Sequence, residues 1–256
     1  MEAWLEFGRG PLFRISFVIM ILGLARLVAL QIIGMIETFK HNEDHIVAWR
    51  DITKTTLSWL VPIFSIWKKL PLYSLISFGF HIGLILVPLF LAAHVMLWKS
   101  SVGFGWFKIP QELANWLTIL TIVTGLLLFI LRIANRNARF ISRRQDFIWP
   151  ILLIIPFLTG FLCSNVNISA GFYQAMMLIH LLSANLIMIL IPFTKVAHCV
   201  LMPLSHYISG TAWKFPVGGG DRVIETIGYA GKPTWMEKPR IGVHTSEITV
   251  KEEQAS

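Results

Sequence analysis

The sequence has 256 residues, of which 55% are hydrophobic and only 14% carry a charge, and its mean hydropathy is +0.67. Soluble domains carry about 25% charged residues, so this composition excludes an ordinary soluble enzyme. The net charge of +8 does not indicate a nucleic-acid partner, because the basic residues gather in loops between apolar stretches, where membrane topology explains them.

Five apolar stretches are long enough to cross a bilayer as helices, since a hydrocarbon core of about 30 Å takes roughly 20 residues. The first contains Arg26 and is followed by no small-residue cleavage site, so we expect a retained span rather than a signal peptide. The fourth is the shortest and contains Pro150 and Pro156. The sequence therefore predicts an all-α membrane protein, a bundle of five transmembrane helices. In chain order the expected spans are residues 12–36, 72–98, 113–131, 147–163 and 172–200.

Basic residues in the loops set the expected orientation of these spans. The loops after the third and the first stretch are strongly basic, whereas the loop after the second has two basic residues and the loop after the fourth has no charge. The positive-inside rule then places the N-terminus outside and the C-terminus in the cytoplasm. The basic residues of the two cytoplasmic loops are Arg132, Arg136, Arg139, Arg143 and Arg144, and Lys40, Arg50, Lys54, Lys68 and Lys69.

Residues 1–200 are expected to form the membrane domain. Within it, residues 41–71 mix charges with tryptophans, which predicts a helical segment lying at the inner membrane surface between the first two spans. Residues 201–256 are polar and contain several prolines and a glycine run that lacks the Lys-Ser/Thr of a phosphate loop. We expect them to form a cytoplasmic tail that docks on a partner.

Four of the eight histidines lie inside the second and fifth stretches: His81, His94, His180 and His198. An ionisable side chain within a span is a functional-site hypothesis by default, because hydrocarbon offers it no partner. The two stretches are separated by two others and so run antiparallel. This places His81 and His198 toward the cytoplasmic side, and His94 and His180 toward the outer side. Two imidazole pairs at two depths suit bis-histidine ligation of two haem irons between facing helices.

The spacing of the histidines fits ideal helices in only one of the two stretches. His180 and His198 are 18 residues apart, about five full turns, so they would share one helix face. His81 and His94 are 13 residues apart, which leaves a phase error of roughly 140°. Pro88 lies between them and can kink or rewind the helix. The pairing requires that distortion.

The sequence resembles the gamma subunit of respiratory nitrate reductase in three features. These are the plan of five helices, the two histidines in the second stretch, and an H-x17-H pattern that ends in "PFTKVAH" at 192–198. The wider family of di-haem cytochrome b membrane subunits includes heterodisulfide-reductase-like and sulfite-reductase-associated complexes. The resemblance is to this wider family, since His81 and His94 stand a few residues further apart than in the nitrate reductase subunit. It covers roughly residues 11–205. It implies haem b between His81 and His198, haem b between His94 and His180, and quinol chemistry near the outer haem.

Five further polar residues have expected roles beside the haems. Arg26 and Arg132 could bind propionates of the inner haem through charge-assisted bonds, or could extend to the lipid headgroups. Lys99, Lys108 and Glu112 border the expected outer haem and could line a quinone pocket, or could be ordinary interfacial anchors.

The chain is therefore predicted to be a di-haem b subunit of a respiratory complex in the cytoplasmic (inner) membrane. It would pass electrons between quinone or quinol and an iron–sulfur partner subunit, since its two cysteines cannot hold an iron–sulfur centre of its own. Two alternatives stay open. One is a transporter that uses the histidines as a proton relay, which would usually show carboxylates inside the spans or broken-helix repeats, neither of which the sequence shows. The other is a haem-free membrane anchor.

Overall fold

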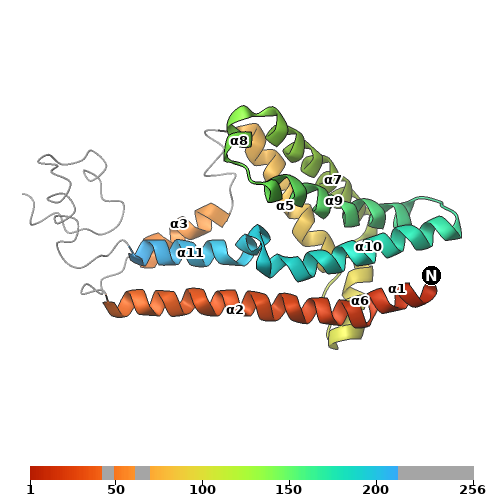
Figure 1. The fold of residues 1–256 in the computed structure, drawn as a ribbon, viewed down its shortest axis with the longest axis horizontal. Helices are drawn as coiled ribbons and strands as arrows, with labels where there is room; N and C mark the ends of the chain where they lie inside the picture. The colour runs from red at the N-terminus through yellow and green to blue at the C-terminus, as the bar shows by residue number, and fades with distance from the viewer. Residues whose placement is uncertain (42–48, 61–69, 213–256) are drawn as a thin grey trace, which may run out of the picture. The chain divides into compact units, whose positions relative to one another are not determined.

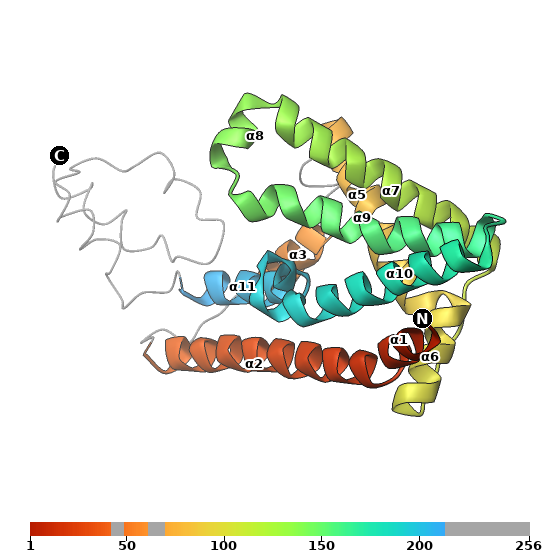
Figure 2. The same cartoon turned by 45° about the vertical axis from the view of Figure 1, so that its right-hand side comes forward.

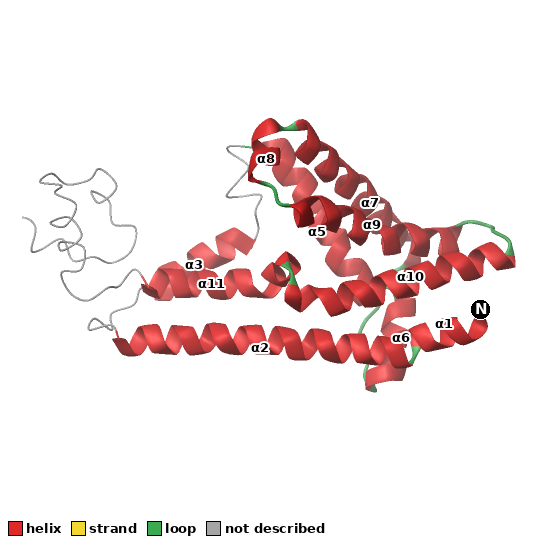
Figure 3. Ribbon diagram, viewed as in Figure 1, coloured by secondary structure: helices red, strands yellow, loops and turns green. Residues whose placement is uncertain are grey.

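The computed structural model describes residues 1–41, 49–60 and 70–212, and within these ranges the regular structure is helical, with no strand (Figure 3). It confirms the predicted all-α fold with five helices long and apolar enough to cross a membrane. The chain is therefore a multi-pass membrane protein, and the side on which each terminus lies stays a prediction. The five candidate spans are Glu2–Glu37, Pro71–Phe90, Gln111–Ala134, Arg144–Asn165 and Ala170–Phe193.

Figure 1 shows the helices of the described residues in chain order. They are α1 (Glu2–Arg9), α2 (Pro11–His41), α3 (Trp49–Leu60), α5 (Pro71–Phe90), α6 (Ala92–Val102), α7 (Gln111–Ala134), α8 (Arg136–Ile141), α9 (Arg144–Asn165), α10 (Ala170–Leu190) and α11 (His198–Ala212). Two 3-10 turns, Ile191–Phe193 and Lys195–Ala197, lie between α10 and α11.

The chain divides into two units, the first made of residues 1–25 and 61–197 and the second of residues 26–60 and 198–256. In the second unit α3 packs against α11, where the hydroxyls of Thr53 and Tyr207 are 2.8 Å apart. The predicted boundary at residue 200 falls inside α11, so the division into a membrane domain and a tail stays a prediction. Much of the predicted interfacial segment, 42–48 and 61–69, and the tail from residue 213 lie outside the described residues.

In the first unit, α7 contacts both α5 and α9, and α9 contacts α10 (Figures 1 and 2). Small residues bring α5 and α7 close together: a Cβ added at Gly83 would overlap the Thr121 side chain and come within 2.6 Å of the Leu117 carbonyl oxygen. Helices in lipid associate largely through such close packing of small residues. The Thr121 hydroxyl donates to the carbonyl one turn earlier, at 2.7 Å, so it is not left unpaired in an apolar setting.

The second span is not the continuous helix predicted over residues 72–98. Helix α5 ends at Phe90, Leu91 is extended (φ −61°, ψ 134°), and α6 begins at Ala92. Pro88 lies inside the last turn of α5, where it removes a backbone donor and crowds the preceding turn. The distortion that the histidine pairing requires is thus a break, and it places His94 in a separate short helix.

The fifth span is also broken, so the predicted continuous helix over residues 172–200 is wrong. Helix α10 ends at Leu190 and gives way to 3-10 turns around an extended Thr194 (φ −132°, ψ 177°). His198 then opens α11 instead of ending the fifth span. The inference that His180 and His198 share one helix face fails, because no single helix carries both.

Candidate functional site

Two of the four predicted histidines lie together in the first unit. The ring centres of His94, on α6, and His180, on α10, are 6.0 Å apart, and the ring planes are within 9° of parallel. A metal–imidazole bond measures about 2.0–2.1 Å, so two imidazoles on opposite sides of one metal ion have ring centres roughly 6 Å apart. The ring-centre separation of His94 and His180 therefore matches, in length, that of two such imidazoles.

The break between α5 and α6 is what orients His94. Its Nδ1 is 3.1 Å from the carbonyl oxygen of Val87, seven residues earlier. On a continuous helix seven residues rise about 10 Å, which would put this carbonyl out of reach. The extended conformation of Leu91 turns the chain so that the ring folds back on the end of α5. The break that separates His81 from His94 thus also fixes the orientation of the His94 imidazole.

The carbonyl groups exposed by this break are bonded by the loop that follows α6. Trp106 Nε1 donates to the Leu89 carbonyl at 2.7 Å, and the Ile109 amide donates to the Phe90 carbonyl at 3.0 Å. Within a membrane, backbone polar groups must find partners inside the protein. The break is therefore a stable feature supported by residues 103–110, and not a frayed helix end.

His180 is held against α9 at a point where that helix lacks a side chain. Its Nδ1 is 2.8 Å from the Pro156 carbonyl oxygen. Gly160 follows Pro156 by one turn and so lies on the same face of α9. A Cβ at Gly160 would come within 3.0 Å of Cε1 and 3.1 Å of Nδ1 of the imidazole. Sequence reasoning missed Gly160, and the signal that could have found it is a glycine one turn after a proline within a span.

The hydrogen bonds of both rings select the tautomer that leaves the lone pair on Nε2. A carbonyl oxygen only accepts, so Nδ1 of His94 and of His180 carries the proton, and the lone pair is on Nε2. Among the described residues, neither Nε2 has a hydrogen-bond partner.

The second predicted pair, His81 and His198, is not tested by the geometry. His81 lies on α5 in the first unit, where its Nδ1 is 2.7 Å from the Ser77 carbonyl oxygen one turn earlier. His198 belongs to the second unit, so the pairing stays a prediction. In the described part of the chain no group of three or more His, Cys, Asp or Glu side chains could hold a metal ion. A haem iron needs only two protein ligands, because the porphyrin supplies the others.

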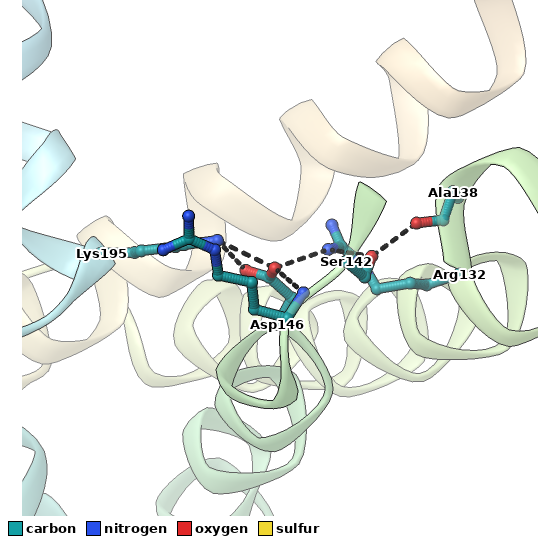
Figure 4. A network of polar contacts seen from close by, with 6 residues as sticks. Arg132, Ala138, Ser142, Asp146 and Lys195 are labelled. Carbon is teal, nitrogen blue, oxygen red and sulfur yellow. Dashed lines mark hydrogen bonds and ion pairs between the residues drawn. The ribbon is translucent and has the colours of Figure 1, made fainter. Parts of the chain in front are cut away.

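A carboxylate at the start of α9 gathers three basic or polar groups (Figure 4). Asp146 accepts from Lys195 Nζ at 2.7 and 2.8 Å and from the Arg143 amide at 2.8 Å. Arg132 Nη1 is 4.0 Å from the same carboxylate and donates to Ser142 Oγ at 3.2 Å. This ion pair joins residues 49 positions apart, and no pattern in the sequence indicates it. It anchors the 3-10 turn that leads into α11.

The remaining predicted residues lie apart from one another. Lys99 is near the end of α6, Lys108 is in the following loop, and Glu112 is in the first turn of α7, and all three side chains are exposed. Arg26, on α2, is the first residue of the second unit. The roles of these residues, and of Arg132, toward quinone and haem propionates stay predictions.

No protein-family model and no solved structure matches this sequence. A curated protein of Nitratidesulfovibrio vulgaris (strain Hildenborough) is 31% identical to it over 222 residues, which cover 84% of this chain and 96% of the relative. The chain belongs to this relative's family. The relative is named only "Protein", so family membership supplies no activity, and a functional proposal must come from the geometry of the histidines.

Proposed function

We propose that this chain is a haem b-binding membrane subunit that carries electrons between quinone or quinol and an iron–sulfur partner subunit. The observation that supports the proposal is the pair His94 and His180. Their rings are 6.0 Å apart and nearly parallel, and each has its Nδ1 engaged by a backbone carbonyl. A histidine that ligates a metal almost always donates its other ring N–H in this way.

The residues of the site would have different roles in holding such a cofactor. Nε2 of His94 and of His180 would ligate the iron, while the Val87 and Pro156 carbonyls fix the orientation of the rings. Gly160 leaves the space that the His180 ring occupies. When bound, haem supplies one-electron transfer, and the axial ligands and the surrounding dielectric tune its potential.

The rest of the proposal stands on the sequence. His81 and His198 would ligate a second haem b nearer the cytoplasm, with Arg26 and Arg132 toward its propionates. Lys99, Lys108 and Glu112 would border the quinone near the outer haem. The excess of basic residues in alternate loops supports an outside N-terminus and a cytoplasmic C-terminus in the cytoplasmic (inner) membrane.

One structural observation favours the proton-relay transporter as a second candidate. Discontinuous helices are typical of secondary transporters, and both histidine-bearing spans are broken. The sequence shows no broken-helix repeats, but the two breaks found here mean that this no longer argues against a transporter. Helices α5, α6 and α10 nevertheless contain no Asp or Glu, which a proton pathway would ordinarily use.

Absorption spectroscopy of the purified full-length chain separates these candidates. The proposal predicts a reduced-minus-oxidised haem b spectrum with about two haems per chain, in keeping with two bis-histidine sites. His94→Gln and His180→Gln should each lose one haem, and the double variant should lose no more than either. His198→Gln should lose the other haem, and the control His206→Gln should lose none. A colourless wild-type protein overturns the proposal, and proton flux in liposomes would then test the transporter.

A further inference from the structure

The short helix α8 presents two apolar side chains almost completely to its surroundings. Phe140 is 91% exposed and Ile141 is 80% exposed, the highest values among the large hydrophobic residues that the structure describes. Isolated exposed apolar residues need no explanation. Two adjacent ones, each more exposed than the side chains facing outward from the candidate spans, indicate a surface that something covers.

Helix α8 is positioned to meet the membrane surface. It forms the turn between two candidate spans, α7, which ends at Ala134, and α9, which begins at Arg144 (Figures 1 and 2). A segment separated from one span by one residue and from the next by two cannot extend far from the headgroup region, because each residue adds at most about 3.3–3.6 Å.

Hydrogen bonds at both ends hold α8 in place. The Asn135 side-chain oxygen accepts from the Asn137 and Ala138 amides at 2.9 and 3.2 Å. At the other end Ser142 Oγ donates to the Ala138 carbonyl at 2.6 Å and accepts from Arg132 Nη1 at 3.2 Å (Figure 4). The exposure of Phe140 and Ile141 is thus imposed by a capped helix and not by a loose loop.

The same helix carries positive charge that no carboxylate neutralises. Arg136 and Arg139 are exposed on the same short helix as Phe140 and Ile141. In the described parts of the chain neither arginine has an Asp or Glu within ion-pair distance. The nearby Asp146 is engaged by Lys195 and lies beside Arg132. The surface therefore combines guanidinium donors with apolar side chains.

We propose that the α8 surface, Arg136 to Ile141, binds the headgroups of anionic phospholipids. Guanidinium groups bind phosphate oxygens through two parallel hydrogen bonds. Apolar side chains on the same short helix would enter the boundary between headgroups and acyl chains, as in interfacial amphipathic helices. Lipid fits this surface better than a protein partner, because the surface lies at the end of two spans and is basic. The proposal does not depend on haem binding.

The test compares the full-length chain with Arg136→Gln/Arg139→Gln after reconstitution in nanodiscs of equimolar phosphatidylcholine and phosphatidylglycerol. Native mass spectrometry then counts the phosphatidylglycerol molecules that stay bound. An arginine near an anionic surface contributes about 1 kcal/mol, so each substitution should weaken retention about fivefold. The matched control, Arg9→Gln/Arg14→Gln, removes two exposed arginines from α1 and α2 and should keep the wild-type number.

A second measurement addresses the apolar part of the surface. Amide exchange over residues 136–141 should be slower in the mixed nanodiscs than in phosphatidylcholine alone, and Phe140→Ser/Ile141→Ser should remove the difference. Unchanged lipid retention in the arginine variant overturns the proposal, as does an equal loss in the control. Protection of α8 that requires a co-purified protein, whatever the lipid, assigns the surface to a partner and overturns the lipid proposal as well.

Discussion

The two histidine-bearing spans break in the same way and are stabilised differently. In "PLFLAAH" (88–94) and "PFTKVAH" (192–198) a proline precedes a histidine by six residues, and an extended residue, Leu91 or Thr194, separates the helical segments. The first break is held by neutral groups: His94, Trp106 and Ile109 donate to carbonyls at the end of α5.

The second break combines local hydrogen bonds with an ion pair. The Thr194 hydroxyl donates to the Leu190 carbonyl at 2.9 Å, and the Ala197 amide donates to the Thr194 carbonyl at 3.2 Å. The long-range contact is the pair between Lys195 and Asp146. Similar sequences thus make similar breaks. The neighbouring residues decide whether a break is stabilised by neutral hydrogen bonds alone or also by an ion pair. Only the second should respond strongly to salt.

The largest effect on stability and haem content is expected from a substitution beside His180, which pairs with His94. Gly160→Val would place methyl groups where the His180 ring lies, so either the ring or α9 must shift. Overpacking of this kind costs about 1–3 kcal/mol of stability. We expect a lower thermal midpoint in detergent together with loss of one haem from the purified chain. Gly171→Val is the matched control, since a Cβ at Gly171 meets nothing within 4 Å. Equal haem content in the two variants would contradict the placement of His180.

A smaller effect is expected where the loop after α6 supports the first break. Trp106→Phe keeps the aromatic ring but removes the donor to the Leu89 carbonyl. The loss of one such hydrogen bond costs about 1 kcal/mol, and it should lower the thermal midpoint by the same amount at low and at high salt. Trp116→Phe is the control, because Trp116 is 71% exposed. If both variants unfold alike, the Trp106 bond does not support the break.

The number of spans could be predicted from the sequence, and the breaks within them could not. Each apolar run long enough to span the hydrocarbon core predicts one crossing, and the described residues contain five helices of sufficient length. Hydropathy measures the polarity of side chains and not the conformation of the backbone. The runs 72–98 and 172–200 therefore remain apolar through Leu91 and Thr194, where the helices break. Pro88 permitted a distortion in the sequence, but its position depends on Trp106 and Ile109, which lie beyond the next helix.

The candidate site was predictable in part for the same reason. The pairing of His94 with His180 followed from an antiparallel arrangement of two spans, and the structure brings these rings together. Gly160 and Pro156 were missed because they act through an empty position and a backbone carbonyl, and which side chain these meet depends on the packing of α9 against α10. The ion pair between Asp146 and Lys195 joins residues 49 apart, and only the packing of the helices shows that they meet.

The smallest expected effect, and the one that separates the two breaks, concerns that ion pair. Asp146→Asn keeps an oxygen that can accept from the Arg143 amide but removes the charge that Lys195 contacts. Because the Lys195 side chain is 49% exposed, the pair should contribute about 0.5–1 kcal/mol. A double-mutant cycle with Lys195→Gln isolates this coupling from the other contacts of either residue. The coupling should shrink in 1 M salt, where the Debye length is about 3 Å. Two outcomes would show that the two breaks are not stabilised differently. One is the absence of coupling between Asp146 and Lys195 at low salt, and the other is a stability loss in Trp106→Phe that varies with salt as strongly as this coupling.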